Sequence, residues 1–171
     1  MKRLMLMRHA KTEPWIEGID DHARALTPTG HGAAAAMAVA LKSEGWVPEV
    51  ALISSARRTR ETWKHLSQAF EDCKVVVEEG LYLAGERGIY DYIDDVAAAE
   101  CVMVVGHNPG MHDLAVRLLR GAGSQDHQAA RRVAAKMPTG GAALFEADEA
   151  GQLSEFEFRL HNFIRPKDIL E

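Results

Sequence analysis

The amino-acid sequence predicts an α/β protein, a three-layer α/β/α sandwich on a mostly parallel sheet with an antiparallel C-terminal strand. Short apolar runs alternate with segments of helical periodicity, which is typical of parallel strands joined by helices that cover both faces of a sheet. Near the C-terminus apolar and polar residues alternate instead, which favours an antiparallel strand. The chain has 171 residues, enough to bury a substantial core, and we expect one domain over residues 1–171.

The order of apolar and periodic segments predicts the individual elements. The apolar runs expected to form strands are residues 2–7, 49–55, 74–79 and 100–107. The segments expected to form helices are residues 30–45, 57–70, 88–99 and a segment that follows Asn108. The first helix is rich in alanine, and Gly45 is a suitable residue to end it.

Two of the expected helices carry clear apolar faces. One face of the helix over residues 57–70 collects Thr59, Trp63, Leu66 and Phe70. In the helix after the fourth strand, Asn108 is placed to cap the first turn and Pro109 to occupy its first position. The apolar stripe of that helix consists of Met111, Leu114, Ala115, Leu118 and Leu119.

The C-terminal part is expected to form a β-hairpin. Residues 141–147 and 153–161 flank the turn-like segment "DEAG". In the second of these runs Phe156, Phe158 and Leu160 alternate with charged residues, as in a strand with one buried face.

Composition indicates which classes of function and which cellular compartment are expected. The chain has 20 basic and 25 acidic side chains, and a net charge of 20 − 25 = −5 disfavours general binding to nucleic acid or to anionic membranes. We expect no membrane span, because no apolar stretch approaches 18 residues, and no signal peptide. Cys73 and Cys101 are expected to be free thiols of a cytoplasmic protein, with a disulfide as the alternative.

Polar residues that suit an anion follow three of the expected parallel strands. These residues are Arg8 and His9 after the first strand, Ser54, Ser55, Arg57, Arg58 and Arg60 after the second, and Gly106, His107 and Asn108 after the fourth. The carboxyl ends of parallel strands meet at one edge of the sheet, where α/β proteins bind ligands. The topology is therefore expected to bring two histidines and at least two arginines together.

This set of side chains suits a dianionic phosphoryl group. Arginine binds pairs of phosphate oxygens and stays charged, and histidine attacks phosphorus when neutral or donates a hydrogen bond when protonated. Helix N-termini add N–H groups and partial positive charge. The sequence lacks a glycine-rich loop of the type GxxxxGK[ST], so nucleotide phosphates are not expected to be held in that way.

The segments "LMRHAKT", "SSARRTRET" and "VGHNPG", in this order, resemble the histidine phosphatase superfamily, also called phosphoglycerate mutase-like. The segment "DDHARALTPTG" and the short chain resemble its SixA branch of small phosphohistidine phosphatases. The resemblance implies a phosphoglycerate mutase-like fold and a hydrolase that needs neither a metal nor a cofactor.

The resemblance also implies roles for individual residues. His9 would be the nucleophile that becomes phosphorylated, and Arg8, Arg58 and His107 would bind the phosphoryl group. Ala10 stands where the family usually has glycine. The motif frame selects Arg58 as the phosphate arginine, but the neighbouring arginines at positions 57 and 60 leave this choice open, and Arg57 is also placed to pair with Glu61 one turn later.

Other site assignments carry explicit alternatives. Thr12, Asp21 and Arg24 would line the substrate site, or Thr12 would shape a turn and the other two would pair structurally. A metal site at His107 and His112 is the less favoured interpretation, because their spacing matches no known ligand motif. The proton donor to the leaving group is unassigned, with Glu79 and Glu86 as candidates.

The sequence thus predicts a phosphatase that forms a phosphohistidine intermediate on His9. The expected partner is a phosphate-bearing substrate, with a phosphohistidine protein favoured because a protonated imidazole leaves without strong acid catalysis. The alternatives are a small-molecule phosphomonoesterase on the same scaffold and a non-catalytic module that binds phosphate or a phosphoprotein. The sequence leaves the oligomeric state open.

Overall fold

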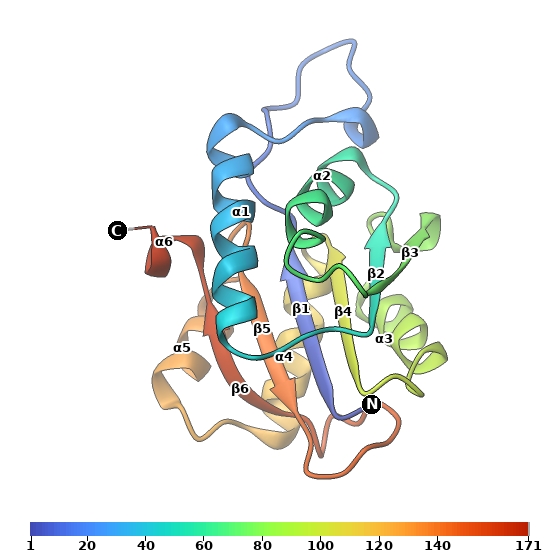
Figure 1. The fold of residues 1–171 in the computed structure, drawn as a ribbon, viewed down its shortest axis with the longest axis vertical. Helices are drawn as coiled ribbons and strands as arrows, with labels where there is room; N and C mark the ends of the chain where they lie inside the picture. The colour runs from blue at the N-terminus through green and yellow to red at the C-terminus, as the bar shows by residue number, and fades with distance from the viewer. Residues whose placement is uncertain (171) are drawn as a thin grey trace.

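A computed structural model describes residues 1–170 and contains one six-stranded sheet with helices on both faces (Figure 1). The strands in chain order are β1 (Arg3–Arg8), β2 (Val50–Ser54), β3 (Lys74–Glu78), β4 (Cys101–Gly106), β5 (Ala142–Glu146) and β6 (Arg159–Ile164). Their order across the sheet is β3-β2-β4-β1-β5-β6.

The sheet is mostly parallel, as the sequence predicts. Strand β1 pairs in parallel with β4, and β2 pairs in parallel with both β3 and β4. Strand β5 pairs antiparallel with β1 and with β6, so β5 is the reversed strand and β6 again runs in the direction of β1. The predicted antiparallel C-terminal strand is therefore confirmed, with the reversal located one strand before the last.

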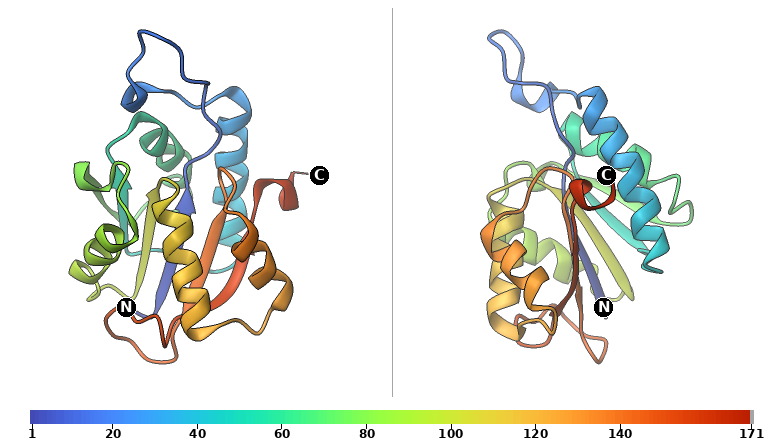
Figure 2. Two further views of the ribbon diagram at one scale, coloured as in Figure 1. Left: turned by 180° about the vertical axis from the view of Figure 1, so that it is seen from behind. Right: turned by 90° about the vertical axis from the view of Figure 1, so that its left-hand side faces the viewer.

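The helices form the two outer layers of the sandwich. They are α1 (Pro28–Ser43), α2 (Arg57–Leu66), α3 (Glu86–Asp95), α4 (Gly110–Ala122), α5 (His127–Ala135) and α6 (Pro166–Ile169), with short 3-10 turns η1 (Asp21–Ala23) and η2 (Glu79–Leu81). Helices α1 and α2 cover one face of the sheet, and α3, α4 and α5 cover the other (Figure 2). None of the helices among residues 1–170 is long and apolar enough to cross a bilayer.

Alternation along β1 supplies both halves of the core. Leu4 and Leu6 pack into the cluster beneath α3, α4 and α5, whereas Met5 and Met7 pack into the cluster beneath α1 and α2. Successive side chains of a strand point to opposite faces, so a continuous apolar run is what a strand covered on both sides requires. The strand that ends at the candidate site is thus fixed by apolar packing on both of its faces.

The helix starts follow from local capping. Helix α1 begins two residues before the predicted segment, because Thr27 accepts a hydrogen bond from the Gly30 amide and Pro28 occupies the first turn. Helix α5, which the sequence analysis missed, begins after Asp126, whose carboxylate accepts from two amides of the first turn.

The predicted capping of α4 by Asn108 is wrong. The helix begins at Gly110, and the Asn108 side-chain amide donates instead to the carbonyl of Met137, 2.9 Å away. The apolar stripe of α4 is correct, since Met111, Leu114, Ala115 and Leu118 are buried.

The predicted strand over residues 153–161 is wrong in its first half. Strand β6 begins only at Arg159, and residues before it form turns in which the Phe158 amide donates to Ser154 O at 3.1 Å. The side chain of Phe156 is 75% exposed, whereas that of Phe158 is fully buried, although a strand would place both on one face. Turn formation therefore overrides the alternating pattern here.

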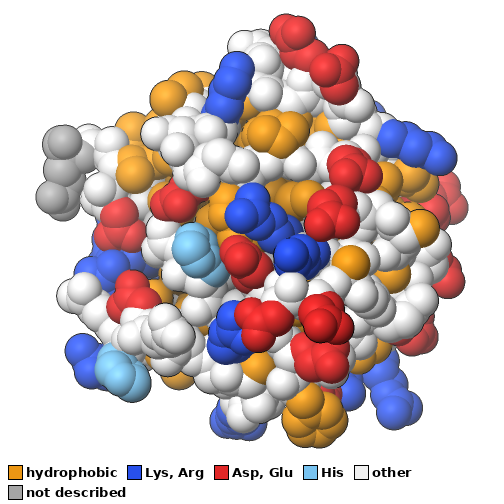
Figure 3. Space-filling view, turned by 60° about the horizontal axis from the view of Figure 1, so that its bottom comes forward, with side chains coloured by type: hydrophobic (Ala, Val, Ile, Leu, Met, Phe, Trp, Pro, Cys, Tyr) orange, Lys and Arg blue, Asp and Glu red, His pale blue; other side chains and the backbone are white. Residues whose placement is uncertain are grey.

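Basic and acidic side chains lie next to one another on the face shown in Figure 3, and no patch of one sign dominates its described part. This mixture agrees with the small negative net charge. Cys73 and Cys101 are free thiols, as predicted.

Candidate active site

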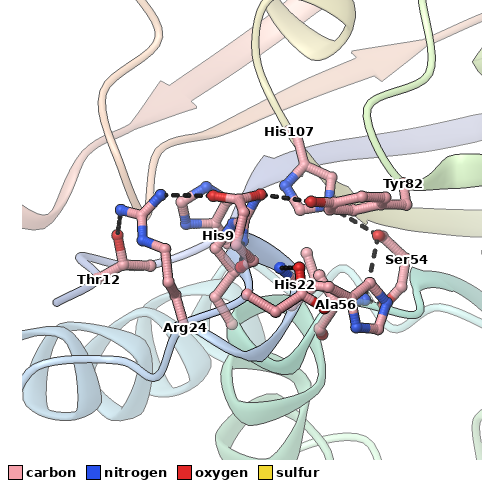
Figure 4. Close-up of polar contacts among 12 residues, drawn as sticks. His9, Thr12, His22, Arg24, Ser54, Ala56, Tyr82 and His107 are labelled. Atoms are coloured by element: carbon pink, nitrogen blue, oxygen red, sulfur yellow. Dashed lines mark hydrogen bonds and ion pairs between the residues drawn. The ribbon is translucent and has the colours of Figure 1, made fainter. Parts of the chain in front are cut away.

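Two histidines lie side by side at the carboxyl edge of the sheet. His9 follows β1 and His107 follows β4, which pair directly, and their ring centroids are 5.3 Å apart (Figure 4). Ser54, the last residue of β2, contributes its hydroxyl to the same place. The structure therefore brings together residues from three strand ends, as the parallel topology predicts.

The hydrogen bond of His9 fixes which ring nitrogen is available. Its Nδ1 lies 2.8 Å from the carbonyl oxygen of Ala10, and because a carbonyl only accepts, Nδ1 carries the proton. The Nε2 atom then holds the lone pair. Burial, together with the charges of Arg58 and Arg8, lowers the pKa of His9 to about 4, so the ring is neutral at pH 7.

The backbone at His9 is held from several sides. The His9 amide donates to Gly106 O at 3.1 Å, and the Gly140 amide donates to His9 O at 2.9 Å. The amide of Ala10 donates to the hydroxyl of Thr62, 3.0 Å away on α2. The methyl group of Ala10 is fully buried, so alanine is accommodated at this position.

His107 is buried and makes one hydrogen bond. Its Nε2 lies 2.7 Å from Ser54 Oγ, whereas its Nδ1 is buried with no hydrogen-bond partner among residues 1–170. Burial, and after it the proximity of His9 and Arg58, lowers the pKa of His107 to about 3. The Nε atom of Arg8 is likewise buried and unpaired within the described residues, while its Nη1 donates to Met137 O at 3.2 Å.

The three arginines of α2 differ in their burial. Arg58 is only 4% exposed, and its guanidinium donates to the carbonyl and to the carboxylate of Asp21, at 2.8 and 3.1 Å. Arg57 pairs with Glu61 on the exposed side of the helix, as its spacing suggests, and the exposed Arg60 donates to Ser55 O. Of these three, only Arg58 points into the site.

The segment before α1 brings the remaining predicted residues to the rim of the site. Arg24 donates to the Asp21 carboxylate at 2.8 Å and to the Thr12 hydroxyl at 2.9 Å (Figure 4). The Asp21 carboxylate also accepts from Arg58 and from the Tyr82 hydroxyl. The Tyr82 hydroxyl, with the two guanidinium groups, holds the pKa of the Asp21 carboxyl far below its usual range.

Tyr82 is the site residue that the sequence analysis missed. It follows η2, and its ring stands edge-on to the rings of His107 and His22, with centroids 5.6 and 4.9 Å away. Its position just beyond a parallel strand was the available signal, because that strand ends at the same edge of the sheet as the others. Burial raises the pKa of the Tyr82 hydroxyl, and its hydrogen bond to the Asp21 carboxylate raises that pKa further.

Three further candidates from the sequence are Glu79, Glu86 and His112. Glu79 and Glu86 make no hydrogen bond or ion pair with the histidines or arginines of the site within residues 1–170, and Glu86 instead lines a surface hollow beside Arg117. His112 Nε2 lies 2.7 Å from Val133 O. Within the described part of the chain, no group of three or more His, Cys, Asp or Glu side chains is arranged to hold a metal.

Comparison with known proteins shows the family of the chain. A family model described as the histidine phosphatase superfamily (branch 1) matches residues 4–82. The chain is also similar to a crystal structure of SixA from Agrobacterium tumefaciens, provisionally assigned as a phosphohistidine phosphatase, with 28% identity, a TM-score of 0.80, and coverage of 96% of this chain and 98% of that one. The chain belongs to the histidine phosphatase superfamily.

Within this superfamily the chain is SixA-like in its fold. An uncharacterised protein of Mycobacterium tuberculosis is 32% identical over 152 residues, which cover 88% of this chain and 92% of that protein. An uncharacterised chloroplastic protein of Arabidopsis thaliana is 32% identical over 133 residues. That match covers 71% of this chain and 60% of the length of the plant protein.

Proposed function

We propose that this chain is a metal-independent phosphatase that hydrolyses protein phosphohistidine through a phosphohistidine intermediate on His9. The observation that carries the proposal is a pair of buried nitrogens, Arg8 Nε and His107 Nδ1, that lack hydrogen-bond partners among residues 1–170. Buried polar groups are nearly always paired, and these two lie beside a neutral histidine at the ligand-binding edge of the sheet. Phosphoryl oxygens would satisfy both.

In the first step Nε2 of His9 attacks phosphorus in line with the leaving group. A P–N bond forms to His9 as the bond from phosphorus to the leaving atom breaks, and the bonding pair goes with that atom. Arg8 and Arg58 would neutralise the charge on the equatorial oxygens, and His107 would donate a hydrogen bond. The hydrogen bond from Nδ1 of His9 to Ala10 O stabilises the positive charge that develops on the ring.

In the second step water attacks the phosphorylated His9. A P–O bond forms as the P–N bond breaks, the electron pair returns to Nε2, and the proton from water leaves with inorganic phosphate or through solvent. In both steps the other residues of the pocket position the phosphoryl group and neutralise the charge on its oxygens, and they form no covalent bond to it.

The protonation states at the site favour a leaving group that departs without a strong acid. Asp21 is ionised at neutral pH, and within residues 1–170 the side chains of Glu79 and Glu86 make no hydrogen bond or ion pair with the histidines or arginines of the site. A protonated imidazole leaves phosphorus as a neutral molecule, whereas an alkoxide needs a proton. This difference supports protein phosphohistidine over an alkyl phosphate as the substrate.

The test is His9→Ala, with His127→Ala as the matched control, because His127 is an exposed histidine at the start of α5. Wild-type protein and the control should release phosphate from a histidine-phosphorylated protein and carry an acid-labile phosphoryl label when stopped during turnover. His9→Ala should show neither while retaining its circular dichroism. Normal turnover by His9→Ala would contradict the proposal.

The same assay separates the alternatives. Faster hydrolysis of alkyl phosphates than of phosphohistidine would indicate a small-molecule phosphomonoesterase. Binding of the phosphoprotein without phosphate release and without label on His9 would indicate a non-catalytic module.

A further inference from the structure

A loop over residues 13–20 rises from the rim of the candidate site and exposes three large apolar side chains. Trp15, Ile16 and Ile19 are 61%, 52% and 44% exposed. In Figures 1 and 2 this loop projects beyond the carboxyl edge of the sheet, farther than any neighbouring connection. None of the three side chains belongs to the core clusters, so the fold does not use them.

The base of the loop is fixed to site residues. The Arg24 guanidinium donates twice to Glu13 O, at 3.1 and 3.0 Å, and the same side chain contacts Thr12 and Asp21. At the tip the Ile19 amide donates to Ile16 O at 3.2 Å. Gly18 between them has a φ of +87°, which glycine adopts without strain. The loop is therefore preorganised beside the site.

A cluster of exposed apolar side chains of this kind marks a contact surface. Acidic residues are interspersed with the apolar ones, namely Glu13, Glu17 and Asp20, all exposed. Their charge repels nucleic acid and anionic bilayers, and it favours a protein surface on which basic side chains surround an apolar patch. Because the loop stands on the rim of the site, a protein that presents a phosphoryl group to His9 would also contact the loop.

We infer that the tip of the 13–20 loop binds the protein that carries the phosphoryl group, on an apolar, basic-rimmed surface beside its phosphorylated side chain. The inference rests on the proposed function and names the specificity-determining surface for it. Free phosphohistidine contains the same reacting group without a protein surface, so its hydrolysis does not depend on contacts with the loop.

The test compares kcat/KM for two probes, a phosphotransfer domain phosphorylated on histidine and free phosphohistidine. Trp15→Ala should lower kcat/KM for the phosphorylated domain about tenfold, mainly through KM, and change it less than about twofold for free phosphohistidine. Trp15→Phe should recover most of the loss. The matched control is Phe156→Ala, because Phe156 is 75% exposed in the connection from β5 to β6, which lies at the other end of the strands from the 13–20 loop (Figure 1). This substitution should change neither value of kcat/KM.

Equal changes on both probes, or no change on either, would overturn the inference while wild-type turnover leaves the proposed function intact. A concentration-dependent dimer that sedimentation detects in the wild type and not in Trp15→Ala would also overturn it, because the loop would then bind a second copy. Wild-type protein that hydrolyses neither probe would contradict the proposed function itself.

Discussion

Arg58 shows how position on a helix decides the role of a side chain. It lies one turn before Thr62, whose hydroxyl accepts from the Ala10 amide, so the face that carries Arg58 packs against the end of β1. Arg57 and Arg60 project from the exposed side of the same helix. The same residue type within one turn is therefore buried at one position and exposed at the other two.

Substitution of these arginines tests the assignment. Arg58→Ala should lower kcat/KM for a phosphohistidine substrate by about a hundredfold or more, because it removes a preorganised cation from the phosphoryl oxygens. Arg57→Ala should change kcat/KM less than about threefold, because Arg57 makes only an exposed ion pair. Steady-state kinetics of the two variants decides between them, and a larger loss in Arg57→Ala would reverse the assignment.

At the scale of elements, α1 is tied closely to the end of β1. The first turn of α1 packs on the backbone that follows His9, and the Thr27 amide donates to Lys11 O at 3.0 Å. A Cβ atom on Gly30 would lie 2.1 Å from the same carbonyl oxygen. Glycine at this position is what allows the helix to lie so close to the backbone that follows β1.

Two glycines of α1 give a matched pair of variants. Gly30→Ala should destabilise the protein by about 2 kcal/mol or more, because backbone atoms must move to admit the methyl group. Gly32→Ala should stabilise it by about 0.5–1 kcal/mol, because nothing lies within 4 Å of the added Cβ and alanine favours the helix. Urea unfolding measures both values, and similar values for the two variants would contradict this account of the packing.

For the whole molecule, the two buried histidines link stability to pH. Their pKa values in the folded protein are about 4 for His9 and about 3 for His107, below the value of 6.5 for an exposed imidazole. Below pH 6.5 the unfolded chain therefore binds protons that the folded protein does not. The free energy of unfolding should fall as the pH drops through this window.

The expected slope approaches about 1.4 kcal/mol per pH unit for each of the two imidazoles. Urea unfolding at pH 7, 6 and 5 measures it, and His107→Gln should reduce the slope, since it removes one of the two groups. An unfolding free energy that stays constant from pH 7 to pH 5 would contradict burial of neutral histidines.

Much of the architecture and of the site could be predicted from local patterns. Apolar runs and helical periodicity gave the order of strands and helices, and the parallel topology placed His9 and His107 at one edge. The strand predicted over residues 153–161 is wrong over residues 153–158, because alternation is a local signal and turn hydrogen bonds outweigh it there. The start of α4 failed because Asn108 has a distant partner, Met137.

The sequence by itself determined the α/β class, the edge at which the site lies and the residue types that gather there, because these depend on periodicity and on the direction of strands. Only the tertiary structure decided that Nε2 of His9 carries the lone pair, that Arg58 is the buried arginine and that Tyr82 joins Asp21 across 61 positions of the chain. Protonation, burial and such pairing depend on which distant segments pack together, and local sequence does not encode that.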